Sequence, residues 1–429
     1  MSFLLSVVKP PRGNLSISLI TVTICAAAFL GLYYTEKATS LSAVSVFKFA
    51  ACSRKSALPR FPAEAAMEER KGVREMDDRF EFDAEGCSVI KGKWVFNSLI
   101  EPLYSDRTCP YLEKQVTCTK NGRPDSDYLR WEWEQDDCFL PKFSPKGVLK
   151  KLRGKRLMFI GDSIQRGQWM SFVCTVESVI ADNEKSMVKY NRSSHFVFTA
   201  KEYNATIEYY WAPFLVESNT DRKIIADPTQ RIVRVDSISR HADSWKSADI
   251  LVFNSYVWWM SGLTINSLWG SFPNAEEGAQ ELERTSAYTI ALKTWANWID
   301  TSIDPNRTRV FFTTSSPTHM WSGDWNRKNG LNCYNETRPV AKVKRVWGGD
   351  KMMEVAANVV RKMRVPVTFI NVTGLSELRV DAHTSVYGET RGKLLTAKQK
   401  ADPLRNADCI HWCLPGVPDT WNRILYAYL

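Results

Sequence analysis

The stretch Leu157-Met158-Phe159-Ile160-Gly161-Asp162-Ser163 decides how this chain folds. Its apolar residues predict a buried strand, and a helix-like stretch begins just after Ser163 and runs from Ile164 to Ile180. The first backbone N–H groups of a helix lack intrahelical partners and can hold an oxyanion. Ser163 is therefore a candidate nucleophile. The alternative is an ordinary turn, in which Asp162 and Ser163 only cap the helix.

A serine nucleophile needs an imidazole to take its proton and a carboxylate to orient that imidazole. Only His411 has an aspartate, Asp408, three residues before it, among the five histidines His195, His241, His319, His383 and His411. We predict a catalytic triad of Ser163, Asp408 and His411. His383 follows Asp381 by two residues, and we expect His383 and His319 to be structural or to line an acceptor cleft.

Strand-like and helix-like runs alternate along the rest of the chain. Strands are predicted at Arg156–Ile160, Ile207–Trp211, Asp249–Phe253, Val310–Thr314 and Val367–Asn371, and helices at Thr285–Ile299 and Lys351–Met363. This alternation predicts an α/β domain with a parallel sheet and a ligand site at the carboxyl ends of its strands. Asn254 also follows a strand, so we expect it on the same sheet edge as Ser163.

The N-terminal segment has the pattern of a membrane anchor. Residues 15–34 carry no charge and have about the 20-residue length that spans a bilayer. Lys9 and Arg12 precede them, which predicts a cytosolic tail at 1–14 and a lumenal C-terminus. The alternative is a cleaved signal peptide. Residues 35–85 lack a sustained apolar period and predict a flexible stem.

Cysteines and glycosylation signals agree with a lumenal chain. Cys25 lies in the anchor and Cys52 after it, which leaves eight cysteines of the ten for disulfides. Spacing alone does not give their pairing. A zinc site at Cys409, His411 and Cys413 is the alternative, but it lacks the usual ligand spacing, so we expect no metal. Five Asn-x-Ser/Thr sequons follow the anchor, at Asn191, Asn204, Asn306, Asn335 and Asn371.

Several long motifs resemble one family. Residues 159–169 (FIGDSIQRGQW), 408–416 (DCIHWCLPG), 109–111 (CPY) and 118–128 (CTKNGRPDSDY) are similar to the plant trichome birefringence-like family, above all to its xylan O-acetyltransferase branch. The resemblance covers roughly residues 87–429. It implies an SGNH-hydrolase-like (flavodoxin-like) parallel sheet with helices on both faces at 141–429. A small Cys-rich lobe at 86–140 would pack on that sheet. It also implies a single-pass type II protein of the Golgi membrane.

The resemblance also implies roles for individual residues. Asn254 would donate its amide to the oxyanion hole beside the Ser163 N–H, and the alternative is an asparagine that only caps a turn. Apart from the resemblance, Arg166 is a candidate to orient the Gly161-Asp162-Ser163 turn or to contact the donor, and the alternative is a surface ion pair. Most tryptophans are expected in core packing, but some near the proposed site, with Trp258 and Trp259 as candidates, would stack on sugar rings. The implied disulfides are Cys87–Cys138, Cys109–Cys174, Cys118–Cys413 and Cys333–Cys409.

The net charge of +10 fits an acidic polysaccharide better than nucleic acid, because no nucleic-acid-binding motif accompanies it. The expected function is transfer of acetyl groups through an acetyl-serine to O-2 or O-3 of xylosyl residues in xylan. Acetyl-CoA or an acetylated carrier would supply the acetyl group, with no bound cofactor. The alternatives are a transferase for mannan, xyloglucan or pectin, an acetyl esterase, and a wall-binding module without chemistry.

Overall fold

A computed structural model describes residues 82, 86–190, 195–272, 278–327, 330–344, 351–390 and 392–429, all within one compact unit, residues 68–429. The expected tail, anchor and almost all of the stem lie outside the described residues, as does the Asn191 sequon. Of the helices that the structure describes, none combines the length and the apolar character needed to cross a bilayer.

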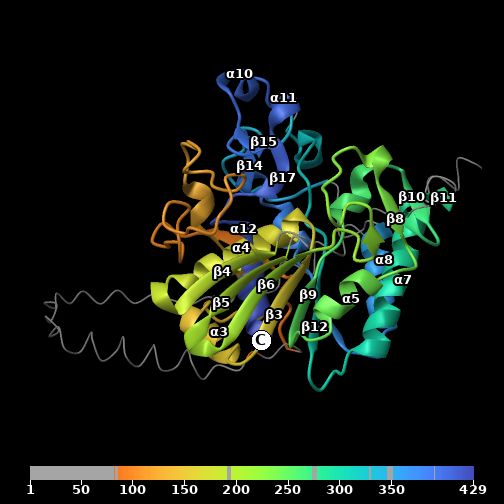
Figure 1. Cartoon of the computed structure of the whole chain (residues 1–429). Coiled ribbons are helices and arrows are strands. Elements are labelled where there is room, and N and C mark those ends of the chain that lie inside the picture. Colours follow the sequence, from red (N-terminus) through yellow and green to blue (C-terminus); the bar gives the residue numbers. More distant parts are fainter. Residues whose placement is uncertain are drawn as a thin grey trace, which may run out of the picture. The chain divides into compact units, whose positions relative to one another are not determined.

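A seven-stranded sheet forms the centre of the fold (Figure 1). In spatial order its strands are β13 (Val367–Ile370), β12 (Arg309–Thr313), β9 (Ile250–Phe253), β3 (Arg156–Gly161), β6 (Ala205–Trp211), β5 (His195–Ala200) and β4 (Lys185–Tyr190). The first five are parallel. Numbered along the chain, their order is the flavodoxin-like 2-1-3-4-5, with its switch point between β3 and β9.

The sheet is mixed rather than wholly parallel, which corrects the sequence prediction. β5 pairs antiparallel with both β4 and β6. Only residues 201–204 join β5 to β6, and parallel neighbours need a crossover of a dozen residues or more. The short connection therefore fixes the antiparallel edge.

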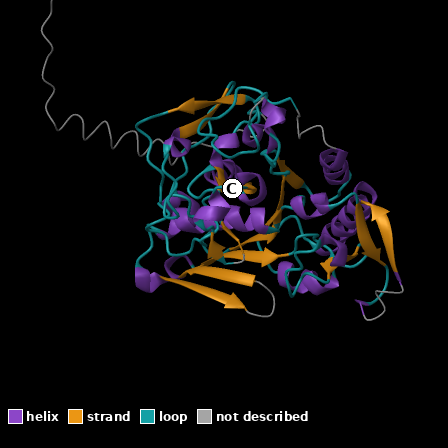
Figure 2. Cartoon of the chain, turned by 90° about the horizontal axis from the view of Figure 1, so that it is seen from above, coloured by secondary structure: helices purple, strands orange, loops and turns teal. Residues whose placement is uncertain are grey.

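Alternate residues of β3 feed two separate cores. Leu157 and Phe159 are buried in one hydrophobic cluster, whereas Met158 and Ile160 are buried in the other. Helices α3 (Pro145–Lys151), α4 (Ser163–Glu177) and α12 (Val417–Tyr428) contribute to the first cluster, and α5 (Ser239–Trp245), α7 (Arg284–Ser302) and α8 (Lys351–Arg361) to the second. Figure 2 shows helices on both sides of the strands.

The Cys-rich lobe shares the first of these cores. Its antiparallel pair of strands, β1 (Gly92–Phe96) and β2 (Trp131–Gln135), buries Trp133 in the cluster that also holds Phe159. Trp94 Nε1 donates to the Leu375 carbonyl at 2.7 Å. The lobe is therefore packed on the α/β part, as expected.

Smaller elements complete the described structure. A second, four-stranded sheet was not predicted from the sequence. In spatial order its strands are β11 (Ala279–Glu283), β10 (Thr264–Leu268), β8 (Ile232–Arg234) and β7 (Glu217–Ser218). β14 (His383–Ser385) pairs antiparallel with β17 (Asp408–Trp412). Besides several short 3-10 helices, the other short elements are α9 (Thr373–Glu377), β15 (Glu389–Thr390), β16 (Lys393–Leu394), α10 (Ala397–Lys400) and α11 (Pro403–Asn406).

Candidate active site

Ser163 is the first residue of α4, directly after the end of β3. The Asp162 carboxylate caps this helix by accepting from the Ile164 N–H at 2.8 Å. The Tyr209 hydroxyl donates to the Asp162 carbonyl at 3.0 Å. Position 161 accepts only glycine without a shift of the backbone, because a Cβ there would overlap the Asn254 carbonyl. The turn is thus fixed from three sides, and the Ser163 N–H has no partner within its helix.

His411 and Asp408 reach Ser163 from the far end of the chain. His411 Nε2 lies 2.7 Å from Ser163 Oγ, and His411 Nδ1 lies 2.7 Å from Asp408 Oδ2. The other oxygen, Asp408 Oδ1, accepts from the backbone N–H groups of Ile410 and His411, at 3.0 Å each. The structure therefore joins the three predicted triad residues in one hydrogen-bonded chain.

The electrostatics of Asp408 suit an orienting carboxylate. Burial by itself raises the pKa of Asp408, but the charge of His411 and the hydrogen bonds from His411 and Ile410 outweigh burial and hold that pKa well below its usual range. Asp408 thus stays ionised at neutral pH. Its side chain is 21 % exposed and that of His411 17 %, so a reactant can approach the pair.

Asp162, next to the nucleophile, has the opposite character. Burial raises its pKa to about 6, although the Ile164 N–H and the charge of His411 favour the ionised form. Asp162 Oδ2 is buried, and no residue that the structure describes meets it at full hydrogen-bond geometry. Asp162 is therefore a helix cap under the site, and its titration falls near neutral pH.

The four implied disulfides are confirmed as Cys87–Cys138, Cys109–Cys174, Cys118–Cys413 and Cys333–Cys409. Two of them flank His411. A cysteine in a disulfide has no thiolate to offer a metal, so the zinc alternative at Cys409 and Cys413 is wrong. Within the described ranges, no group of three His, Cys, Asp or Glu side chains is placed to hold a metal ion.

His319 and His383 form a buried pair behind His411. His319 Nδ1 lies 2.6 Å from His383 Nε2, and the outer nitrogens face the carbonyls of Glu377 and His411 at 3.0 Å. The His383 ring stacks on Trp412, with centroids 4.0 Å apart. Both histidines are structural and do not line a cleft.

Asn254 does not fit its expected role in the oxyanion hole. It is buried, and its side-chain Nδ2 donates to the carbonyls of Thr313 and Thr314 at 3.0 Å each. Both amide hydrogens of Asn254 are thus used in hydrogen bonds that join the ends of β9 and β12. Family resemblance places an asparagine here, but only the structure shows where its hydrogens point.

The two expected tryptophans differ from each other. Trp259 is fully buried and donates to Ser255, so it has no face for a sugar and that prediction is wrong. Trp258 is half-buried, and the Arg231 guanidinium lies over its ring at 4.0 Å. Trp258 therefore already has a cation on one face.

Arg166 reveals residues that the sequence prediction missed. Its guanidinium pairs with Glu113 at 3.1 Å and donates to Gln115 Oε1 at 3.1 Å. Gln115 Nε2 in turn lies 3.0 Å from His411 Nδ1. Arg166 thus links the turn of Ser163 to the Cys-rich lobe. The nearby Cys118, which pairs with Cys413 beside His411, was the one sequence signal for this approach.

Other expected positions lie outside the triad. The sequons at Asn204, Asn306 and Asn335 are exposed, whereas Asn371 is half-buried and accepts from the Thr373 N–H at 3.1 Å. A cavity of about 450 Å³ opens between the Cys-rich lobe and α12, lined among others by Leu103, Trp131 and Arg379, and it includes no triad residue.

Comparison with known proteins agrees with this site. Residues 140–428 match the PC-Esterase family, the GDSL/SGNH-like acyl-esterase family found in Pmr5 and Cas1p, and residues 85–139 match the PMR5 N-terminal domain. Protein trichome birefringence-like 3 of Arabidopsis thaliana is 57 % identical, with both chains covered completely. Probable xylan O-acetyltransferase 8 of Oryza sativa subsp. japonica is 48 % identical over 99 % of both chains. Xylan O-acetyltransferase 6 of the same rice is 46 % identical over 80 % of this chain and 62 % of its own length.

Proposed function

The chain belongs to the trichome birefringence-like family, and from this premise we propose that it is a polysaccharide O-acetyltransferase whose acceptor is xylan. The observation that carries the chemistry is the hydrogen-bonded chain from Ser163 Oγ through His411 to Asp408, with 2.7 Å at each link. The choice of xylan is supported by relatives that are named xylan O-acetyltransferases.

In the first half-reaction Ser163 Oγ attacks the carbonyl carbon of an acetyl donor, and His411 Nε2 takes the serine proton. Asp408 stabilises the imidazolium through Nδ1. The Ser163 N–H at the start of α4 donates to the tetrahedral oxyanion. Collapse of this intermediate expels the donor's leaving group, to which His411 returns the proton, and an acetyl ester remains on Ser163.

In the second half-reaction the O-2 or O-3 hydroxyl of a xylosyl residue attacks the acetyl-serine, and His411 Nε2 takes the hydroxyl proton. The second tetrahedral intermediate collapses to the acetylated sugar, while Ser163 Oγ recovers its proton from His411. Every proton thus moves through one atom, His411 Nε2, which the Asp408 contact holds in the required tautomer.

Other parts of the proposal rest on sequence. The acetyl donor is acetyl-CoA or an acetylated carrier, used as a substrate and not as a resident cofactor. Residues 15–34 anchor the protein in the Golgi membrane, with the catalytic part in the lumen, where disulfides form. A basic chain in that compartment meets acidic polysaccharide rather than nucleic acid.

A two-stage mass-spectrometric assay tests the proposal. The purified lumenal part receives acetyl donor alone, and we expect an acetyl adduct on Ser163. Xylo-oligomers are then added and should discharge the adduct and appear acetylated, while Ser163→Ala forms neither product. No adduct on the wild type contradicts the covalent mechanism. Discharge by mannan, xyloglucan or pectin oligomers, but not by xylo-oligomers, contradicts the choice of xylan.

Hydrolysis is the second candidate, because the matched family is described as an acyl-esterase family. The same triad would then give the acetyl group to water. Release of free acetate from the adduct at the same rate with and without oligomers would favour the esterase.

A further inference from the structure

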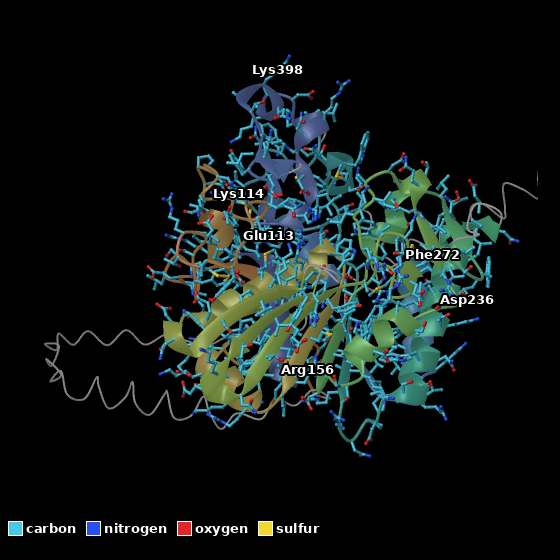
Figure 3. The ribbon with its side chains drawn as sticks, viewed as in Figure 1. Glu113, Lys114, Arg156, Asp236, Phe272 and Lys398 are labelled. Atoms are coloured by element: carbon cyan, nitrogen blue, oxygen red, sulfur yellow. A yellow bond between two sulfur atoms is a disulfide. The ribbon has the colours of Figure 1, made fainter. Side chains whose placement is uncertain are left out.

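Gln115, from the Cys-rich lobe, presents its carboxamide to the triad. Its Oε1 accepts from Arg166 Nη2 at 3.1 Å, and its Nε2 lies 3.0 Å from His411 Nδ1. Figure 3 labels the two preceding residues, Glu113 and Lys114, on the segment of the lobe near the start of α4. Gln115 thus brings the Cys-rich lobe next to the imidazole of His411.

Arg166 decides which way this carboxamide faces. A guanidinium has only donors, so the atom of Gln115 that meets Arg166 has to be the oxygen. Glu113 pairs with the same guanidinium at 3.1 Å and keeps it in place. The NH₂ group of Gln115 therefore faces His411.

The imidazole does not use the hydrogens of that NH₂ group. In the tautomer that takes the serine proton, His411 Nδ1 carries a hydrogen and donates it to Asp408. Nδ1 then has no lone pair for Gln115. No other acceptor for Gln115 Nε2 occurs in the part of the chain that the structure describes. Two amide hydrogens beside the triad are left for an oxygen that the described residues do not supply.

The loop that carries Gln115 is fixed and does not rest loosely on the site. The Leu414 N–H donates to the Val116 carbonyl at 2.9 Å, and Cys118 is bonded to Cys413. Asn121 Nδ2 donates to the Lys114 carbonyl at 2.6 Å and to the Tyr387 carbonyl at 2.7 Å. The loop of Gln115 and the segment of His411 are therefore joined by a backbone hydrogen bond and a disulfide.

Position favours the acceptor over the oxyanion as the partner of this amide. Gln115 lies beside the Nδ1 edge of the ring, whereas the oxyanion forms at the Ser163 N–H. An acceptor hydroxyl has to reach His411 Nε2, so the sugar that carries it lies alongside the imidazole. We propose that the Gln115 carboxamide donates hydrogen bonds to oxygens of the acceptor sugar, which makes the Cys-rich lobe part of the acceptor site. This inference rests on the proposed function.

The test compares Gln115→Met with Gln135→Met, the same substitution in the same lobe. Gln135 lies at the end of β2, and within the described residues its side chain hydrogen-bonds only to the Trp133 carbonyl and the Leu140 N–H. Steady-state transfer to xylo-oligomers gives kcat and the acceptor KM. A fluorophosphonate probe reports Ser163 reactivity without any acceptor, because Ser163 Oγ displaces fluoride from phosphorus while His411 takes the proton.

We expect Gln115→Met to raise the acceptor KM about 10-fold, the loss expected for one or two hydrogen bonds, and to leave fluorophosphonate labelling unchanged. Gln135→Met should match the wild type in both. Gln115→Glu, which keeps the shape but presents only acceptors, should lose acceptor affinity as Gln115→Met does.

Two results overturn the inference: an acceptor KM that does not change in Gln115→Met, or a labelling rate that falls as far as transfer does. The second result would make Gln115 a residue that positions the imidazole. Failure of the proposed function looks different, because the wild type itself would then transfer no acetyl group to any oligomer.

Discussion

The two halves of the active site are built differently. The nucleophile half, Ser163 on the β3–α4 turn, lies at the carboxyl end of the central strand β3 and is held by core packing and by the hydrogen bond from the Ile164 N–H to the Asp162 carboxylate. The base half, Asp408 and His411 on β17, belongs to a two-stranded sheet, and disulfides at Cys409 and Cys413 flank it. The position of Ser163 depends on the fold of the whole domain, whereas the position of His411 depends on the two disulfides. Reactivity needs both.

The largest expected effect comes from breaking either half at its reacting atoms. Ser163→Ala, Asp408→Ala and His411→Ala should each lower kcat on the order of 10³-fold or more, because triad members act as a unit. The double variant Ser163→Ala/His411→Ala should be no worse than either single one. His319→Ala and His383→Ala should retain more activity. Additive losses in the double variant would mean that the two halves work independently.

Removal of a cross-link should separate the halves. Cys333→Ser/Cys409→Ser lacks the bridge beside His411, whereas Cys87→Ser/Cys138→Ser lacks one that is remote from the triad. Each bridge contributes roughly 2–5 kcal/mol through its effect on the unfolded chain. We expect kcat to fall about 100-fold in the first variant and to change little in the second. Acetyl transfer and far-UV circular dichroism, measured below the melting temperature, check this.

Equal losses of kcat in the two disulfide variants, at equal folded fractions, would contradict this comparison. Reduction of the wild type offers an independent check. Activity should disappear at a lower concentration of reductant than the circular dichroism signal of the sheet.

The nucleophile half should be sensitive to a single methyl group. Gly161→Ala places a Cβ against the Asn254 carbonyl, whose residue is itself tied to Thr313 and Thr314. We expect a loss of about 1–3 kcal/mol in unfolding free energy and at least 10-fold in kcat. Gly167→Ala is the control, since a Cβ there meets no atom within 4 Å and helix interiors favour alanine by roughly 0.5–1 kcal/mol. Urea unfolding and acetyl transfer measure both variants.

The sequence predicted the two halves to different extents. The apolar run before Gly161 and the scarcity of histidines identified Ser163 and His411, because strand patterning and triad chemistry are local signals. Gln115 escaped notice because a bridge between residues 295 apart brings its loop to the site. Asn254 was placed on the right sheet edge but given the wrong partner, since hydrogen-bond direction depends on β12. The four-stranded second sheet was not predicted for a similar reason, since its short strands are separated in the chain.

The smallest expected effect is an opposite response of the halves to pH. Burial lowers the pKa of His319 to about 4 and raises that of Asp162 to about 6. At His319, which lies behind His411, the folded protein binds fewer protons than the unfolded chain below about pH 6.5. The unfolding free energy therefore falls as the pH drops towards 4. At Asp162 the folded protein binds more protons than the unfolded chain above about pH 3.8. The unfolding free energy therefore falls as the pH rises through 6.

Burial gives the acid response of the histidine pair its structural cause, and hydrogen bonding works against it. The three contacts of His319 and His383, two to carbonyls and one between the rings, require three protons, and two neutral imidazoles carry only two. Burial opposes the third proton and lowers both pKa values. Acidification therefore places a charge in a buried pair that His383 connects directly to the His411 carbonyl.

Two variants separate these responses. Asp162→Asn keeps an oxygen for the Ile164 N–H but removes the titration, so its unfolding free energy should no longer fall between pH 4 and 6. His319→Gln should instead reduce the decline on the acid side, of which the buried His383 keeps a part because its pKa is also lowered. Each effect is on the order of 1–3 kcal/mol, measured by urea unfolding of the variants and the wild type from pH 4 to 7. If Asp162→Asn and the wild type give parallel curves, the Asp162 carboxyl does not titrate in this range, and the proposed contrast between the halves fails on the nucleophile side.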